Sequence, residues 1–374
     1  MKNNNVFFNR ISNTAIFLII VILFFLKLIL YILIKNQFVD IGIGGGSDAD
    51  YYNAYAEGLS QVAVNTWPVM LRYLNDFGLY SRVGISYILL SFSLFVIPLL
   101  VNKLAGLDFK KNQKYYLYSF LLCSIYPTIY FYIMDVYRDV FMLFSFLIGC
   151  LVVKKSLDSS SFLQFSFLFV LSVLIGWFLI GLRPYLGYAF LLSLLLWKIK
   201  FTKKRIIFLG ILYFIALFTA NYVGAFEFLT EYRAGFDEGN GGSTLGLDFS
   251  NPIMFIPNFI LSFLGQMLGL YITNPLAIVL LLLETIPFLL TLIYVIKNIN
   301  LADNFLRFLF IFFIIYGSVW LISNDNLGTA VRLRMYNYLA IYICFFYILR
   351  VKSYLRKSKG LLKDEDHTDR NGSE

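Results

Sequence analysis

The sequence predicts an all-α, polytopic integral membrane protein, a bundle of about ten transmembrane helices with both termini in the cytoplasm. Three observations predict this class. Hydrophobic residues make up 59% of the chain and charged residues only 14%, whereas soluble domains carry about 25% charged residues. Apolar runs long enough to cross a bilayer recur along the chain. Basic residues are concentrated in alternate connections between these runs.

A transmembrane helix needs about 20 mainly apolar residues, and ten segments meet this condition, some only loosely. The first is too long for a signal-peptide core and has no cleavage site after it, so we expect a retained span. A further stretch, 253–271, either spans the membrane or re-enters it from one face; the prolines in and around it favour re-entry. The ten segments are 15–34, 83–101, 115–134, 137–153, 161–180, 185–197, 206–224, 275–296, 305–322 and 335–349.

The distribution of Lys and Arg orients these spans. With the N-terminus inside and a re-entrant 253–271, 22 of the 31 basic residues lie on the inner side, as the positive-inside rule requires. Lysine dominates inside by 16 to 6, whereas seven of the eight outer basic residues are arginine. Guanidinium is planar and binds phosphate in a bidentate manner, so this bias predicts a phosphate-binding outer face. Ion pairing or headgroup anchoring is the alternative for any single arginine.

The spans form one membrane domain over residues 1–350, with long outer loops at 35–82 and 225–274. Residues 351–374 form a polar cytoplasmic tail that holds the only histidine, His367. The three cysteines fall in apolar runs and lack the spacing of a disulfide framework or a metal site. An enzyme built on this chain therefore needs carboxylates instead of histidine for acid–base chemistry.

The first outer loop carries a glycine-rich acidic motif. Residues 42–52 read Gly-Ile-Gly-Gly-Gly-Ser-Asp-Ala-Asp-Tyr-Tyr, and the glycines allow a sharp turn that presents Asp48 and Asp50. Three roles are open to this pair: holding a divalent cation such as Mg²⁺ or Mn²⁺, supplying a catalytic carboxylate, or capping a helix. The tyrosines that follow begin a helix-like run over 54–64.

Two outer turns between predicted spans also carry charge. Arg138 and Asp139 lie where the third span turns into the fourth. Charges at that depth usually face the interior of a bundle or a wet cavity, and an interhelical Arg–Asp ion pair is the alternative. Arg183 stands between the fifth and sixth spans, two residues before Tyr185.

Three arginines and a glutamate complete the set. Arg233 precedes the glycine-rich segment 239–243, which either cradles an anion through backbone N–H groups or is a flexible loop. Arg332 and Arg334 lie two apart at the start of the last helix and so point about 200° apart. We expect Arg332 to bind ligand and Arg334 to anchor at headgroups. Glu284, within the eighth span, is a functional candidate or bonds to a neighbouring helix.

These motifs together resemble the GT-C class of polytopic glycosyltransferases and bacterial surface-polysaccharide proteins, including repeat-unit polymerases of the Wzy type. The resemblance covers most of residues 35–340. Many GT-C enzymes have an adjacent acidic pair or a large soluble C-terminal domain, whereas here alanine separates the two aspartates and the tail is short. The motifs are the acidic motif after the first span, Tyr126-Pro127 leading to Arg138-Asp139, Arg183-Pro184-Tyr185, the Gly241-Gly242-Ser243 loop, and Asn326-Leu327-Gly328-Thr329 leading to Arg332 and Arg334.

The resemblance implies an enzyme of the bacterial cytoplasmic (inner) membrane with an extracytoplasmic active face. It would transfer or polymerise sugars from polyprenyl-(di)phosphate-linked donors, with O-antigen or capsule repeat-unit polymerisation favoured. The alternatives are a GT-C monosaccharide transferase and, from another class, a lipid-linked oligosaccharide flippase. Transporters usually bind substrate near the bilayer midplane, whereas most charged candidates here lie at the outer face. The expected partners are a lipid-linked sugar, membrane lipids and other polysaccharide-assembly proteins, and no nucleic acid.

The implied mechanism assigns a role to each candidate. An aspartate takes the proton from the acceptor hydroxyl, whose oxygen attacks the anomeric carbon of the donor, while arginines stabilise the departing phosphate and tyrosines stack on sugar rings. The assignment is Asp48 and Asp50 as catalytic or metal-binding residues, Arg138, Arg183, Arg233 and Arg332 as phosphate ligands, and Asp139, Tyr51, Tyr52, Tyr185, Arg334 and Glu284 as supporting residues.

Overall fold

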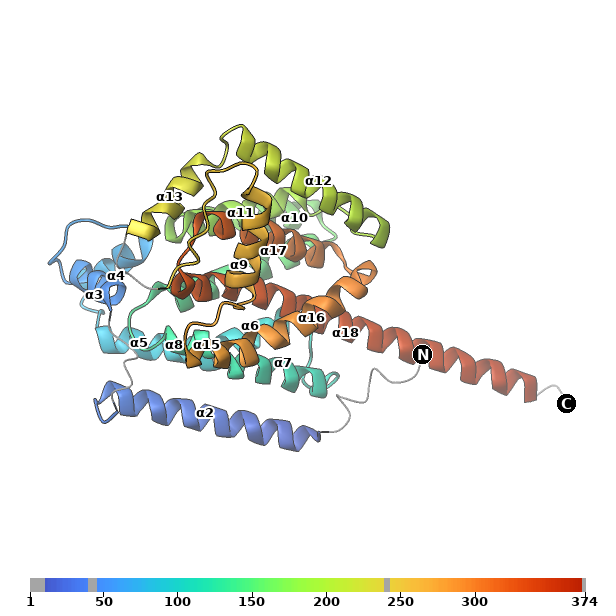
Figure 1. The fold of residues 1–374 in the computed structure, drawn as a ribbon. Coiled ribbons are helices and arrows are strands. Elements are labelled where there is room, and N and C mark those ends of the chain that lie inside the picture. Colours follow the sequence, from blue (N-terminus) through green and yellow to red (C-terminus); the bar gives the residue numbers. More distant parts are fainter. Residues whose placement is uncertain (1–10, 40–45, 239–242, 372–374) are drawn as a thin grey trace.

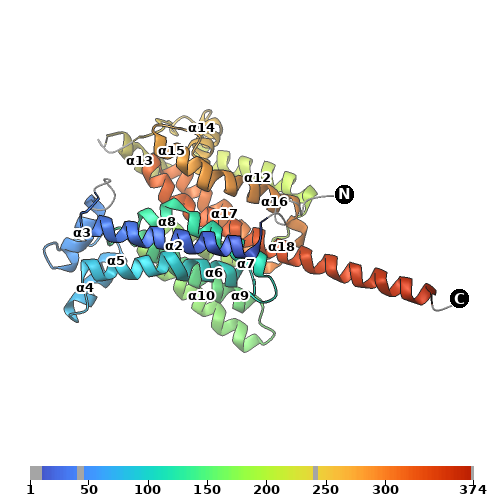
Figure 2. The same cartoon turned by 90° about the horizontal axis from the view of Figure 1, so that it is seen from below.

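The computed structural model describes residues 11–39, 46–238 and 243–371 of the chain. Within these ranges the regular secondary structure is helical, apart from one isolated bridge between Thr244 and Asn326. Eight of the helices described are long and apolar enough to cross a membrane, which confirms the predicted class of polytopic helical membrane protein. Their ribbons run side by side in both views (Figures 1 and 2).

The eight long helices follow eight of the predicted spans. Two of them are continuous helices that contain a π-helical turn. Their bounds are α2 (Asn13–Lys35), α5–η1–α6 (Arg82–Ser91, Phe92–Val96 and Ile97–Leu104), α9 (Arg138–Leu157), α10 (Phe162–Leu182), α12 (Lys203–Tyr222), α15–η3–α16 (Pro275–Leu280, Leu281–Thr285 and Ile286–Lys297), α17 (Asn304–Ser323) and α18 (Leu327–Asn371).

The other two predicted spans are shorter helices. The segment predicted at 115–134 is broken into α7 (Gln113–Ile125) and α8 (Pro127–Phe131). The break falls at Tyr126, which is extended (ψ 105°), because the ring of a following proline disfavours the helical conformation. The segment predicted at 185–197 is α11 (Pro184–Leu196), whose 13 residues extend about 20 Å.

The stretch 253–271 forms α14 (Phe255–Ser262) and η2 (Phe263–Met267). These 13 residues extend about 20 Å, against about 30 Å for a bilayer core. The chain then turns at Gly269, which has a φ of +61° that only glycine adopts without strain. This length favours the re-entrant alternative over a full span.

The two long loops contain helices of their own: α3 (Ser47–Ala56) and α4 (Thr66–Asp76) in the first, and α13 (Glu227–Glu238) in the second. The helical run predicted at 54–64 is wrong, since α3 begins seven residues earlier. Two acidic residues in its first turn favour that start through the helix dipole, and Gly58 (φ +82°) ends it.

The centre of the bundle is formed by α9, α17 and the membrane part of α18, whose side chains are mostly buried. Helices α2 and α12 lie at the periphery (Figures 1 and 2) and expose large apolar side chains such as Phe17 and Ile207. We call the end that holds α3, α4 and the first turns of α5, α9 and α18 the α3 end. The C-terminal part of α18 runs out of the opposite end as one continuous helix (Figure 1).

Candidate functional site

Three of the four predicted phosphate-binding arginines meet at the α3 end. Arg138 is the first residue of α9, and Arg332 lies in the second turn of α18. Arg183 links α10 to α11 in an extended conformation (φ −157°, ψ 109°), which the following proline favours. We call Arg138, Arg183, Arg332, Asp48 and Asp139 the arginine cluster.

Two ion pairs hold the arginine cluster together. Arg332 Nη1 lies 2.5 Å from Asp48 Oδ2, which joins the last helix to the first loop. Arg183 Nη2 lies 3.7 Å from Asp139 Oδ1, and the side chains of this pair are only 4% and 1% exposed. Asp48, at 43% exposed, lies at the open edge of the cluster. Asp139, which follows Arg138 in α9, is thus paired with an arginine from the connection between α10 and α11.

Several guanidinium nitrogens of the cluster have no hydrogen-bond partner within the described residues. They are Nε and Nη1 of Arg183, Nε of Arg138 and Nε of Arg332. A buried donor without a partner costs about 1–3 kcal/mol. Three guanidinium groups against two carboxylates also leave the cluster with one excess positive charge. Both features favour an anion with several acceptor oxygens.

Aromatic rings surround these charges. The guanidinium of Arg332 lies 5.1 Å from the ring centre of Tyr132, and that of Arg183 lies 5.7 Å from that of Tyr185. Burial raises the pKa of Tyr52; Arg138 opposes this shift, while Asp139 and Asp48 add to it. The phenol of Tyr52 is therefore within electrostatic reach of charges from two helices, α9 and its own helix α3. Burial likewise raises the pKa of Tyr232 in α13, which lies near Arg183 and Arg138.

The two predicted catalytic aspartates face different partners. Asp50 lies 2.7 Å from Arg82, whose guanidinium also pairs with Asp135 at 2.6 Å. Neither aspartate is the side-chain cap of α3, since Gly46 occupies that position. The described residues include no group of three or more His, Cys, Asp or Glu side chains that could hold a metal. The glycines at 42–45 lie outside the described residues.

Arg82 and Asp135 form a second charged group that the sequence interpretation did not assign. Burial acts to raise the pKa of Asp135, but hydrogen bonds from Arg82 and the Val136 N–H and the charge of Lys35 lower it overall. The sequence signal that could have identified Asp135 is its position between Tyr126-Pro127 and Arg138. The hydroxyl of Tyr51 donates to the carbonyl of Val62, in the connection between α3 and α4.

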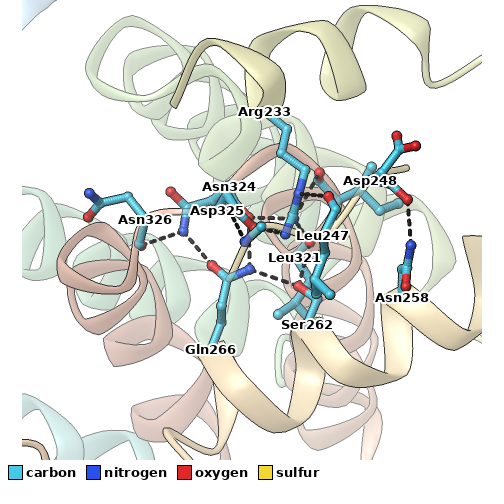
Figure 3. A network of polar contacts seen from close by, with 12 residues as sticks. Arg233, Leu247, Asp248, Asn258, Ser262, Gln266, Leu321, Asn324, Asp325 and Asn326 are labelled. Atoms are coloured by element: carbon cyan, nitrogen blue, oxygen red, sulfur yellow. Dashed lines mark hydrogen bonds and ion pairs between the residues drawn. The ribbon is translucent and has the colours of Figure 1, made fainter. Parts of the chain in front are cut away.

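Arg233 is bonded into a separate polar network (Figure 3). Its Nε donates to the Leu247 carbonyl at 3.1 Å, its Nη1 to the carbonyls of Leu321 and Asn324 at 3.0 and 2.6 Å, and its Nη2 to Asp325. These contacts fasten α13 to the end of α17. The guanidinium is thus occupied by protein acceptors and does not join the arginine cluster. Of segment 239–243, the proposed anion cradle, residues 239–242 lie outside the described residues.

Gln266 and Asn324 extend this network. The Gln266 amide donates to Ser262 at 2.8 Å and to the Asn324 carbonyl at 2.7 Å, and accepts from the Asn324 side chain at 2.5 Å. Asp325 also accepts from the Gly246 N–H at 2.8 Å. Side chains of α14 and η2 thereby hold the α17–α18 turn in place.

The expectation that Arg334 anchors at headgroups is wrong. Arg334 is 3% exposed, and its Nη2 lies 3.0 Å from Oε2 of the fully buried Glu284. Glu284 Oε1 accepts from the N–H and the hydroxyl of Thr128 at 2.9 and 2.5 Å. The two arginines do lie on opposite sides of α18, but the side of Arg334 faces Glu284, η2 and the turn that follows η2. For Glu284, the structure shows the predicted bond to a neighbouring helix.

Comparisons of the chain with protein-family models, with curated proteins and with solved structures each found no match.

Proposed function

We propose that this protein is a membrane enzyme of surface-polysaccharide assembly. It transfers or polymerises sugars from polyprenyl-(di)phosphate-linked donors at the outer face of the bacterial cytoplasmic membrane, and repeat-unit polymerisation is the favoured reaction. The observation that carries the proposal is the arginine cluster, in which the buried Arg183 keeps two guanidinium nitrogens, Nε and Nη1, without a partner in the described residues.

Phosphate suits this cluster better than a carboxylate or a neutral sugar. Guanidinium groups bind phosphate oxygens with short, charge-assisted hydrogen bonds, and a diphosphate offers enough acceptors for three arginines from separate segments of the chain. Charge that develops on a departing phosphate is stabilised most strongly by preorganised donors in a site with little water. The near-complete burial of Arg183 and Asp139 meets that condition.

The distribution of basic residues supports an extracytoplasmic position for the cluster. Lysines such as Lys154 lie at the opposite end of the bundle, and the positive-inside rule assigns that end to the cytoplasm. With α7–α8 and α11 as two further crossings and α14 re-entrant, the chain crosses about ten times and both termini are cytoplasmic. A lipid-linked donor is the form of activated sugar expected at the outer face.

In the proposed reaction Asp48 accepts the proton of the acceptor hydroxyl. The bond from that oxygen to the anomeric carbon forms as the bond from the anomeric carbon to the phosphate oxygen breaks, and the negative charge passes to the phosphate. Asp48 suits this role because it is partly exposed and lies beside Arg332. Asp50 is less suited, because it is bonded to Arg82 outside the cluster. Tyr185 would support a sugar ring.

The test replaces cluster residues singly in cells and examines the surface glycan on a gel. We expect Arg183→Gln and Asp48→Asn to remove long chains and leave a single repeat unit, because loss of one electrostatic partner typically lowers the rate about 10²–10³-fold. Arg72→Gln is the matched control. Arg72 belongs to the same end but lies over the Tyr55 ring, 5.5 Å from its centre, and its loss should leave the glycan unchanged.

The other outcomes separate the alternatives. Complete loss of glycan in the cluster variants would indicate a single-sugar transferase or a flippase instead of a polymerase. Normal glycan in both variants, with protein levels in the membrane equal to wild type, would refute the proposed site.

A further inference from the structure

A pocket lies on the side of α18 that faces away from the arginine cluster. It has a volume of about 330 Å³ and is formed by η2, the turn that follows it, α15 and the first turns of α18. Its wall combines Arg334 and Gln266 with Leu276, Ala277 and Leu280 of α15. A volume of this size falls within the range of about 300–1,000 Å³ that is usual for ligand pockets.

Arg334 supplies donors to this pocket. Among the contacts of the described residues, its guanidinium bonds to the protein through Nη2 alone, and Nε has no partner although the side chain is buried. The turn of the re-entrant segment is shaped to admit it: a Cβ at Gly269 would lie 2.7 Å from Arg334 Nη1. Glu284 offsets the charge of the guanidinium and keeps it in position.

The other wall of the pocket belongs to the membrane-facing surface. Leu276 of α15 is 57% exposed, and its neighbours Ile278 and Val279 are exposed as well. Because α15 opens one of the long apolar helices, these side chains face hydrocarbon. The pocket therefore joins a buried guanidinium to a lipid-facing surface, and polar groups such as Thr273 and Asn274 lie at its rim.

We propose that this pocket binds the phosphate group of a membrane lipid. Arg334 donates to the phosphate oxygens, and the hydrocarbon chain leaves past Ala277 and Leu280 along α15. A lipid phosphate group fits the polar wall of the pocket, and the hydrocarbon chain of the lipid fits the apolar wall. A lipid therefore uses both walls, whereas free phosphate uses only the polar wall. The site is distinct from the arginine cluster, because residues two apart on α18 point about 200° away from each other.

The test measures binding of a labelled polyprenyl monophosphate to the full-length protein in detergent. Every variant carries Arg183→Gln as well, which weakens phosphate binding at the arginine cluster, so that the remaining binding reports the pocket. Ala277→Trp fills the pocket from its lipid side without changing a polar contact. We expect it to weaken binding at least about tenfold, equivalent to about 1.4 kcal/mol. Ile278→Trp, at the next position and outside the pocket wall, should leave the affinity unchanged.

A charge-neutral pair provides the second variant. Arg334→Gln with Glu284→Gln removes the guanidinium without leaving a buried charge, and it should also abolish binding. Equal affinity in the Ala277→Trp protein or in this double variant would overturn the proposal. Displacement of the probe by millimolar inorganic phosphate would show that free phosphate is the ligand, whereas displacement by phosphatidylglycerol vesicles alone supports a lipid headgroup. None of these results depends on the glycan assay, so this proposal and the proposed function can fail separately.

Discussion

Replacing Asp325 by alanine should destabilise the whole bundle, because it leaves the Arg233 guanidinium buried without its carboxylate. The two side chains are 3% and 1% exposed, and breaking such a pair from one side costs about 3–5 kcal/mol. An unfolding entropy of about 2.1 cal/mol/K per residue gives about 0.8 kcal/mol/K for this chain of 374 residues. The expected fall in Tm is therefore about 4–6 °C, measured in detergent by intrinsic fluorescence.

Two controls accompany this variant. Asp248→Ala removes an exposed carboxylate close to the same network (Figure 3) that accepts a hydrogen bond from the nearby Ser250 N–H, and it should leave Tm unchanged. Arg233→Met with Asp325→Leu replaces both charges by apolar groups and should recover much of the lost stability.

A small effect on stability would refute the structural role of Arg233. If Asp325→Ala melted within about 1 °C of wild type, well below the shift expected for a broken buried pair, the pair would not hold the fold. If Arg233→Lys then abolished the glycan at unchanged stability, Arg233 would be a substrate ligand, as its sequence position first indicated.

Two further predictions concern packing and pH. Gly187→Ala should lower the yield of folded protein, because the added Cβ would lie 2.3 Å from the backbone nitrogen of Ile180 and force α10 and α11 apart. The matched control is Gly210→Ala, whose Cβ would have nothing within 4 Å. Size-exclusion profiles measure the yield. The pKa of Asp135 is lowered in the folded protein. Its bond to Arg82 should therefore stabilise the fold fully above the ordinary aspartate pKa of about 4. This stabilisation is lost as the pH falls through the lower pKa that Asp135 has in the folded state. Tm measured against pH should show a shallower acid limb in Asp135→Asn, and an unchanged limb would contradict the assignment.

The membrane helices could be predicted because a span is a local property. The run predicted at 137–153, for example, occupies α9 (Arg138–Leu157). Proline chemistry is local too, and it explains the break before Pro127 that the hydropathy of the run did not reveal. The start of α3 was missed because its polar first turn carries no apolar periodicity, which is the main signal for a helix.

The pairing of charges was not predictable to the same extent. Arg332 and Asp48 are 284 positions apart, and Arg233 and Asp325 are 92 apart. The positions of the arginines at helix ends indicated that they would face the bundle. Nothing in the spacing indicated that Asp48 and Asp50 would meet different arginines.

The sequence by itself therefore determined the membrane class, the places of most membrane helices and the enrichment of one side in arginine, because each of these follows from the composition of single segments. Only the tertiary structure decided that Arg138, Arg183 and Arg332 share one site while Arg233 and Arg334 are held elsewhere. The rotation and depth of each helix decide which charged groups meet, and both are set by packing between segments that lie far apart in the chain.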